Sequence, residues 1–334
     1  MNDRFWPGPL LAIESSCDET AAAVLVGRTV LSNVIASQIE MHRRWGGIVP
    51  EAAARAHVEA LLPVISEALS SAGLALKDLT AIAVANRPGL VGSLSVGVSA
   101  AKALAYARRL PLIGVHHIEG HLLSPFAEAD VPFPHAALIV SGGHTELVVV
   151  RDLGDYEIVG QTIDDAAGEA LDKSARLLGL GYPGGTAIQE QALSGVPRYA
   201  LPKGLKGDTL DFSFSGFKTA VLRLTEREGS ALSVPDAAAS IQETLTEVLA
   251  ERALRAVEEL GLRALTLSGG VAANRRLRER LAAQCAQAGV AFLPAPAALC
   301  TDNAAMIGIA GSWRLQRGDR DGWGLETLPS AELP

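Results

Sequence analysis

The sequence has few cysteines, few aromatic residues and no long apolar run. Cys17, Cys285 and Cys300 are scattered and form no CxxC pair, so they predict neither a disulfide framework nor a thiolate zinc site. No uncharged apolar segment reaches the roughly 18–20 residues of a membrane span, and residues 1–8 lack a signal-peptide core. These absences predict a cytoplasmic protein with no membrane attachment.

The common phosphate-binding motifs give no support to a P-loop or Rossmann interpretation. GxxxxGK[ST] does not occur, and the string GLGYPG at residues 179–184 fits GxGxxG but does not follow a predicted strand, as the Rossmann motif requires. Basic charge is limited too, because 29 Lys and Arg face 37 Asp and Glu, for a net charge of -8. Nucleic-acid-binding domains are usually basic, so an RNA substrate would need a local patch or a recruiting partner. The candidate patches are residues 42–44, 108–109 and 275–280, and each is equally well explained as a solvated helix face.

The rest of the composition is typical of a globular protein, and the chain length favours two domains. The chain has 334 residues, of which 49% are hydrophobic and 20% charged. Residues 10–26, LLAIESSCDETAAAVLV, read as a strand, a polar turn and a second strand. Residues 136–150, AALIVSGGHTELVVV, repeat this pattern, which indicates an internal duplication.

Helical segments alternate with the strands. We expect helices at residues 51–72, 97–110, 164–178 and 235–260, with Pro63 breaking or restarting the first. The alternation predicts α/β architecture. Without a long linker, the domain crossover is expected near residues 117–121, and the last helix, from about Thr301, is expected to return to the first domain. The predicted domains are therefore 1–117 with about 302–334, and 118–301.

Three glycine-marked turns follow apolar strands or helices, at residues 141–144, 182–185 and 268–270. Glycine lets the backbone approach a phosphate closely, although each turn taken alone is more often a plain turn. The third turn opens directly into a helix, where Asn274 could reach a ribose or a base. Asp172 could bond ribose hydroxyls or simply offset the dipole of a helix start.

The segment His116-His117-Ile118-Glu119-Gly120-His121 is a candidate metal site. His117 and His121 are four residues apart, so a helix places both imidazoles on one face. Asp302, at a strand-to-helix switch, is the candidate third ligand, and two histidines with one carboxylate suit Fe(II) or Zn(II). Zincin peptidases place their catalytic Glu directly after the first His, whereas Glu119 lies about 100° further round the helix. A peptidase is therefore disfavoured but stays open.

Ten ordered segments, which cover nearly the whole chain, resemble the TsaD family of tRNA threonylcarbamoyladenosine transferases, formerly called glycoproteases or O-sialoglycoprotein endopeptidases. The segments are LAIESSCDETAAAVL, GGIVPEAAARAH, PGLVGSLSVG, HIEGHLLSPF, IVSGGHTEL, IDDAAGEALDK, YPGG, FSFSGFKTAV, LSGGVAANRRLR and CTDNAAMIG. The resemblance implies an ASKHA (actin/Hsp70/sugar-kinase-like) fold, with two similar lobes and a central nucleotide cleft, in agreement with the duplicated hairpins.

The resemblance also implies roles for individual residues. His117, His121 and Asp302 match the family's ligands for one divalent metal per chain, with Fe(II) the first choice and Zn(II) the alternative. Glu14 matches an acidic residue near the reacting centre and is the candidate catalytic group. The residues matching those that hold the adenylate substrate are Val140, Ser141, Gly142, Gly143 and His144 on the phosphate, and Asp172, Gly185 and Asn274 on the ribose and base.

The implied reaction moves a threonylcarbamoyl group from threonylcarbamoyl-AMP to the exocyclic amine of the adenosine beside the anticodon, in tRNAs that read ANN codons. The implied partners are tRNA, a TsaB-like heterodimer partner, a TsaE-like ATPase and a TsaC-type synthase that supplies the adenylate. Two alternatives remain, a metallopeptidase and a non-catalytic ASKHA scaffold. The scaffold would have no use for the His117, His121 and Asp302 set.

Overall fold

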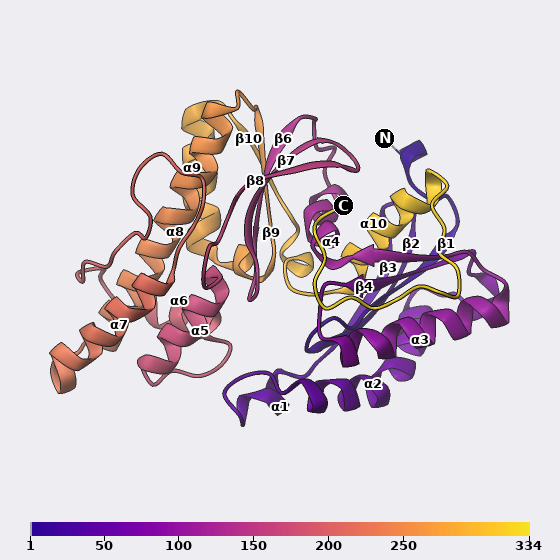
Figure 1. The fold of residues 1–334 in the computed structure, drawn as a ribbon, viewed down its shortest axis with the longest axis horizontal. Helices are drawn as coiled ribbons and strands as arrows, with labels where there is room; N and C mark the ends of the chain where they lie inside the picture. Colours follow the sequence, from indigo (N-terminus) through magenta and orange to yellow (C-terminus); the bar gives the residue numbers. More distant parts are fainter. Residues whose placement is uncertain (1) are drawn as a thin grey trace. The chain divides into compact units, whose positions relative to one another are not determined.

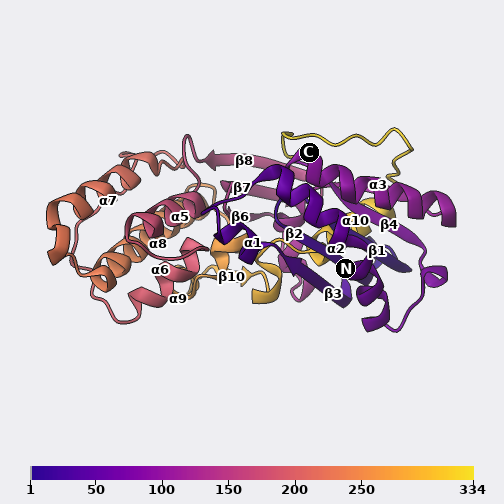
Figure 2. The same cartoon turned by 90° about the horizontal axis from the view of Figure 1, so that it is seen from below.

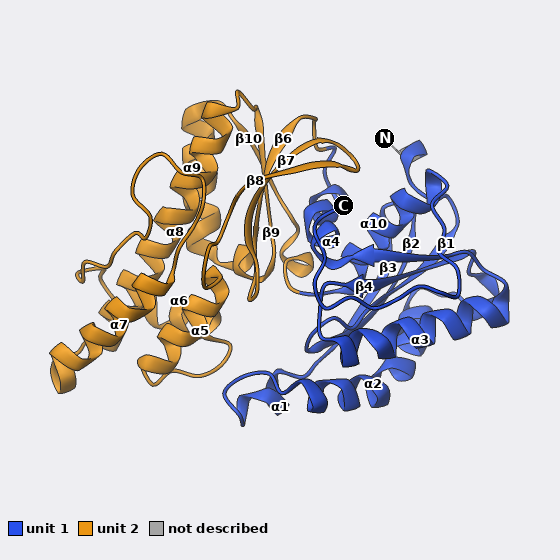
Figure 3. Cartoon of the chain, viewed as in Figure 1, with its two compact units in different colours: residues 1–130, 302–334 blue, residues 131–301 orange. Residues whose placement is uncertain are grey.

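The structure, a computed structural model, describes residues 2–334 and divides into two compact units (Figure 3). Unit 1 runs up to Asp130 and resumes over Asp302–Pro334, and unit 2 is Val131–Thr301. The division falls later than the crossover expected near residue 117. The reason is that α4 (His117–Leu123) packs against α10 (Ala304–Gln316), which keeps α4 in unit 1.

The core of unit 1 is a five-stranded mixed sheet. Its order is β3-β2-β1-β4-β5, with β1 antiparallel to β2 and parallel to β4. The strands are β1 (Pro9–Glu14), β2 (Glu19–Val26), β3 (Thr29–Ser37), β4 (Ala81–Arg87) and β5 (Leu112–His116). Strands β1 and β4 are buried almost throughout, because helices cover both faces of this part of the sheet.

Helices α2 and α3 cover one face of this sheet and α10 covers the other (Figure 1). The helices of unit 1 are α1 (Ile39–Arg43), α2 (Pro50–Ser71), α3 (Val91–Arg108), α4 and α10, with short 3-10 helices η1 (Asn2–Arg4), η2 (Leu76–Asp78) and η3 (Ser124–Ala127). The expected break at Pro63 is wrong, since α2 continues through it. Pro63 is exposed, and burial of Leu61, Val64 and Ile65 on the opposite side outweighs one missing hydrogen bond.

Unit 2 repeats the sheet of unit 1. Its order is β10-β9-β6-β7-β8, and β6 is antiparallel to β7 and parallel to β9, as β1 is to β2 and β4. The strands are β6 (His135–Val140), β7 (Thr145–Asp152), β8 (Asp155–Gln161), β9 (Ala264–Ser268) and β10 (Ala291–Pro294). The two predicted hairpins are therefore β1–β2 and β6–β7, and they occupy equivalent places in the two sheets.

The helices of unit 2 gather on one side of its sheet (Figure 1 and Figure 2). They are α5 (Ala167–Leu177), α6 (Gly184–Ala192), α7 (Ser215–Glu228), α8 (Val234–Glu259) and α9 (Arg275–Ala288), with 3-10 helices η4 (Gly229–Ala231), η5 (Gly270–Ala273) and η6 (Ala297–Leu299). Leu138 and Val140 of β6 share one core with Ile241 and Leu245 of α8. Within residues 2–334 no helix combines the length and apolarity that a membrane crossing needs.

Candidate functional site

The predicted metal ligands meet in unit 1. Helix α4 starts directly after β5 and carries His117 and His121 one turn apart, and Asp302 lies just before α10. The Asp302 Oδ1 atom is 3.1 Å from His121 Nε2 and 3.5 Å from His117 Nε2. One ligand atom from each residue lies within 4.8 Å of the other two. These distances suit a single ion bound by two imidazoles and one carboxylate.

Neighbouring polar groups orient His117. Its Nδ1 atom is 3.0 Å from Glu14 Oε2 and 3.1 Å from Ser16 Oγ, while the other Glu14 oxygen accepts the Ser16 backbone N–H. A carboxylate on one ring nitrogen fixes the tautomer that leaves the other nitrogen free for a metal. Sequence reasoning found Glu14 but missed Ser16, which lies in the same ESSCDET turn.

The charge around these ligands also favours a cation. Burial alone lowers the pKa of His117, but Asp302 and Glu14 outweigh it and raise that pKa to about 9. Burial, with the negative charges of Asp18 and Asp302, raises the pKa of Glu19 to about 10. Clustered carboxylates resist ionisation when no positive charge is near, and a divalent ion would relieve them. The donor set therefore fits a metal ion.

Glu119 cannot serve as the base of a peptidase in this arrangement. Its side chain is fully buried, and both oxygens accept from Arg314 of α10, with Nε–Oε2 at 2.7 Å and the second contact at 3.0 Å. A zincin glutamate must instead reach a metal-bound water. The pair with Arg314 joins the helix that carries both histidines to α10.

In unit 2, the turn after β6 is arranged as an anion cradle. The Ser141 N–H donates to the His144 carbonyl at 2.8 Å, and the His144 N–H donates to Ser141 Oγ at 3.1 Å. Between them, the exposed Gly142 and Gly143 have backbone N–H groups with no hydrogen-bond partner in the described part of the chain. Two open N–H groups in a tight turn suit a phosphate.

Two other glycines let this turn make close contacts. A Cβ on Gly269, whose φ is +91°, would lie 2.4 Å from the Val140 carbonyl oxygen. A Cβ on Gly168 would lie 2.5 Å from the Ser141 carbonyl oxygen. Only glycine fits either place, so the turn after β9 and the start of α5 both contact the Ser141 turn.

Asp172 joins α5 to α6. It lies in the middle of α5 rather than at its first turn, so offsetting that helix's dipole is not its role. Its Oδ1 atom accepts the Gly184 N–H at 2.7 Å, at the start of α6. The structure thereby brings Asp172 beside Gly184, the residue before the predicted Gly185.

Asn274 caps α9. Its Oδ1 accepts the Leu277 N–H at 3.0 Å, and its Nδ2 donates to Gln242 Oε1 of α8 at 3.0 Å. The next residue, Arg275, donates its N–H to Gln189 Oε1 of α6 at 2.7 Å. The sequence offered no signal for Gln189 or Gln242, since single amides far from any motif carry none.

Glu146 lies two residues after His144, the last residue of the Ser141 turn. It is a half-buried residue whose role in the structure the sequence did not reveal. Its Oε2 atom is shielded from solvent and has no hydrogen-bond partner among the described residues. Burial raises the pKa of Glu146 from its ordinary 4.5 to about 7. The folded protein therefore keeps this carboxyl protonated at mildly acidic pH, where the unfolded chain has lost the proton.

Glu146 should accordingly make stability fall as pH rises from about 4.5 to 7 and remain lower above that range, because the folded state binds the extra proton. Glu146→Gln should be more stable than the parent at pH 8 by at most about 3 kcal/mol, and equal to it at pH 4. Urea unfolding at both pH values measures this, with exposed Glu190→Gln as control. An equal change at both pH values would contradict the assignment.

Comparison with known proteins identifies the chain's relatives. A family model described as TsaD, tRNA N6-adenosine threonylcarbamoyltransferase, matches residues 29–309. The chain belongs to this family. A protein named tRNA N6-adenosine threonylcarbamoyltransferase from Anaeromyxobacter dehalogenans (strain 2CP-C) is 52% identical over 333 residues, covering 97% of this chain and 99% of the relative. The namesake from Bacillus subtilis (strain 168) is 48% identical over 330 residues, covering 97% and 95%.

A solved structure bears on the fold of this TsaD-family chain. HypF, in its phosphate- and nucleotide-bound form, matches with a TM-score of 0.62 at 15% identity, over 94% of this chain. The chain spans about half of HypF, 47% of its length. With the two equivalent mixed sheets, this match confirms the predicted α/β fold of the ASKHA type.

Proposed function

We propose that this chain transfers a threonylcarbamoyl group from threonylcarbamoyl-AMP to the exocyclic amine of the adenosine next to the anticodon, in tRNAs that read ANN codons. The amine nitrogen forms a bond to the carbamoyl carbon, the bond from that carbon to the phosphate oxygen breaks, and AMP leaves. The amine loses one proton. Near-full-length identity of about 50% to proteins named for this transfer is the observation that carries the proposal.

His117, His121 and Asp302 are the residues that would hold one divalent ion, Fe(II) first and Zn(II) as the alternative. When bound, such an ion supplies Lewis-acid stabilisation of negative charge on substrate oxygens. Glu14 supports the set by holding the His117 ring. Both Glu14 oxygens already accept hydrogen bonds, so positioning suits this residue better than proton removal.

The adenylate would bind through unit 2. The backbone from Val140 to His144 would hold the phosphate, while Asp172, Gly185 and Asn274 would hold the ribose and base. Fixed N–H groups at the phosphate would stabilise the charge that develops there as the bond to the carbamoyl carbon breaks.

Asn274→Ala should weaken binding of an AMP analogue by roughly 5- to 150-fold, because one buried polar group would be left without a hydrogen-bond partner. The same change removes the cap of α9, which costs about 0.5–2 kcal/mol of stability. Asn274→Asp separates the two effects, because it retains the capping oxygen and loses the amide donor. Calorimetry with AMP and thermal unfolding of both variants measure them. Unchanged affinity in both variants would place the nucleotide elsewhere.

Partners complete the proposal. A TsaB-like protein would pair with this chain, a TsaE-like ATPase would support turnover, and a TsaC-type synthase would supply the adenylate. The chain's charge of -8 favours dependence on partners, because non-specific RNA affinity comes mainly from neutralised phosphates.

The test is an assay of the purified chain with tRNA, threonine, bicarbonate and ATP, with and without the partner proteins. Mass spectrometry of the digested tRNA should find threonylcarbamoyladenosine only when threonine is present. A transcript with guanosine at the target position is the matched control. No modified nucleoside in the complete mixture would refute the proposed transfer.

A further inference from the structure

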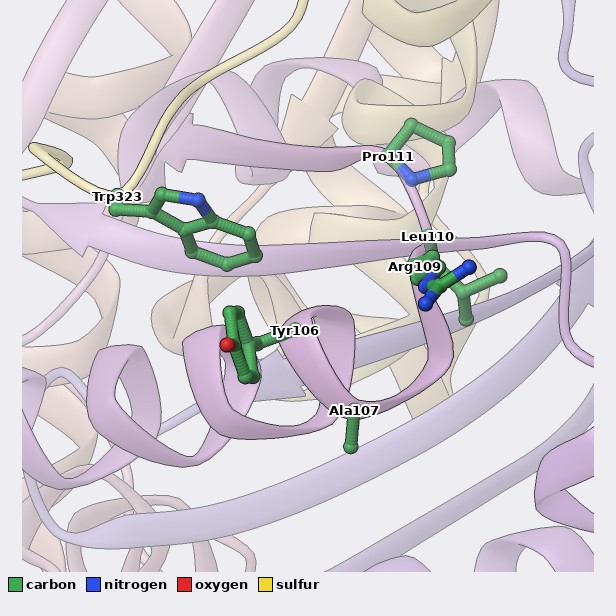
Figure 4. A pocket seen from close by; sticks show the side chains of 6 residues that line it. All are labelled: Tyr106, Ala107, Arg109, Leu110, Pro111 and Trp323. Atoms are coloured by element: carbon green, nitrogen blue, oxygen red, sulfur yellow. The ribbon is translucent and has the colours of Figure 1, made fainter.

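An open hollow of about 610 Å³ lies in unit 1 at the carboxyl end of α3, lined by Tyr106, Ala107, Arg109, Leu110, Pro111 and Trp323 (Figure 4). Trp323, from the segment after α10, faces Tyr106 of the last turn of α3, with ring centroids 5.4 Å apart and planes at 73°. Both rings are unusually exposed, Tyr106 at 72% and Trp323 at 55%. Two large exposed aromatic faces beside an arginine form a surface able to stack a planar ring.

Two arginines, Arg108 and Arg109, lie at this hollow without a carboxylate partner in the described chain. Arg109 is exposed and makes no side-chain hydrogen bond or ion pair with any described residue, and Arg108 donates only to the Lys77 carbonyl at 3.1 Å. No Asp or Glu occurs from residue 79 to residue 118. Asp321, two residues before Trp323, accepts the Gly114 N–H at 2.7 Å.

In the other two basic candidates some of the arginines are paired with carboxylates. Arg276 and Arg280 both pair with Glu243, and Arg275 contacts Glu279 at 3.4 Å. In the patch of residues 42–44, His42 is buried and Arg43 pairs with Glu40 at 3.0 Å, which leaves Arg44 as its exposed arginine without a side-chain partner among the described residues. Arg108–Arg109 is the patch in which neither arginine pairs with a carboxylate of the described chain.

The backbone conformation of Arg109 also bears on the function of its side chain. Arg109 ends α3 with φ at +54°, and it is the one non-glycine residue of the described chain with positive φ. Glycine takes this conformation freely, as Gly289 does at the end of α9, whereas a side chain there is strained. An arginine in a position where glycine would relax the chain is a candidate for a functional side chain.

We propose that the Tyr106–Trp323 hollow with Arg109 binds an unpaired nucleotide of the RNA substrate. The base stacks on the exposed ring of Trp323, which Tyr106 supports from the side, and Arg109, with Lys77 and Arg108 nearby, contacts the phosphates. Stacking on aromatic residues beside a cationic groove is how proteins hold single-stranded RNA without reading its sequence. This inference rests on the proposed transfer to tRNA, and it identifies the surface through which the acidic chain would contact tRNA.

The test is filter binding of the full chain to a tRNA transcript at about 50 and 200 mM salt, a range across which phosphate contacts weaken strongly. Trp323→Leu should weaken binding by about 5- to 150-fold at both concentrations, and Trp323→Phe should restore most of the loss. Arg109→Gly should weaken binding and lower the salt slope by about 1, while the melting temperature stays equal or rises. A more stable variant that binds RNA less well cannot be explained by misfolding.

Matched controls are Trp45→Leu, which changes a tryptophan 56% exposed, and Arg263→Gln, which changes an exposed, unpaired arginine of unit 2. Both should bind tRNA as the parent does. Parental affinity in Trp323→Leu and Arg109→Gly would overturn the inference. If these two variants kept RNA affinity but lost a partner protein in pull-down, the hollow would be a protein-docking site, which also overturns it.

The two proposals fail differently. If the hollow is not used by RNA, the parent still modifies tRNA and the variants bind RNA normally. If the proposed transfer is wrong, the parent makes no threonylcarbamoyladenosine in the complete assay, whatever its affinity for tRNA.

Discussion

His121→Ala should leave well below one metal ion per chain and lower threonylcarbamoyl transfer by roughly 100-fold or more, the effect of losing a main electrostatic stabiliser. The imidazole is fully buried, and its Nε2 lies 3.1 Å from Asp302 Oδ1. Removing it leaves His117 and Asp302 as a two-ligand set. Elemental analysis of the purified variant measures the metal, independently of activity.

The matched control is His57→Gln. His57 is also fully buried in unit 1, but its ring nitrogens contact Thr20 Oγ1 at 2.7 Å and the Cys17 carbonyl at 3.0 Å, and neither partner is one of the three ligands. This variant should keep its metal. Full occupancy in His121→Ala would show that the ion binds elsewhere.

Glu119→Gln should destabilise the protein by about 3–5 kcal/mol, the cost of removing one partner of a buried ion pair. The Arg314 guanidinium is about nine-tenths buried, and Asp319, at 3.7 Å, is too distant to replace both lost contacts. Metal affinity should fall as well, because the pair joins α4, with its two histidines, to α10. Urea unfolding and metal titration measure the two effects.

A double variant, Glu119→Leu with Arg314→Met, should recover most of the stability, since well-packed apolar residues can replace a buried ion pair. Glu40→Gln, at the exposed pair with Arg43, should change little and serves as the surface control. A Glu119→Gln protein as stable as the parent would show that Arg314 finds another partner at little cost.

Local patterns predicted much of this fold. The alternation of apolar runs and polar turns located both hairpins, and the helical period located α8, because each depends on residues close along the chain. The i, i+4 spacing of His117 and His121 likewise put both rings on one helix face. The break expected at Pro63 failed, because a local rule could not weigh the packing of the rest of α2 against one lost hydrogen bond.

The candidate sites were less predictable from local pattern. Asp302 is 181 residues from His121, and its place beside the ligands was expected from its position at a strand-to-helix switch and from the family resemblance, not from spacing. The sequence could not show that the Glu119 side chain meets Arg314 or that Asn274 contacts Gln242, because each contact joins residues on different helices. The roles of Glu14 and of the adenylate residues stay predictions.

By itself, the sequence determined the α/β fold class, the duplicated strand–turn–strand units, the acidic net charge and the placement of two histidines on one helix face. These follow from composition and short-range periodicity, which a chain carries before it folds. Tertiary structure alone decided that Glu119 meets Arg314, that Gly269 and Gly168 crowd the Ser141 turn, and that Trp323 faces Tyr106. Those contacts join residues far apart in the chain, and only the packing of whole helices and sheets brings them together.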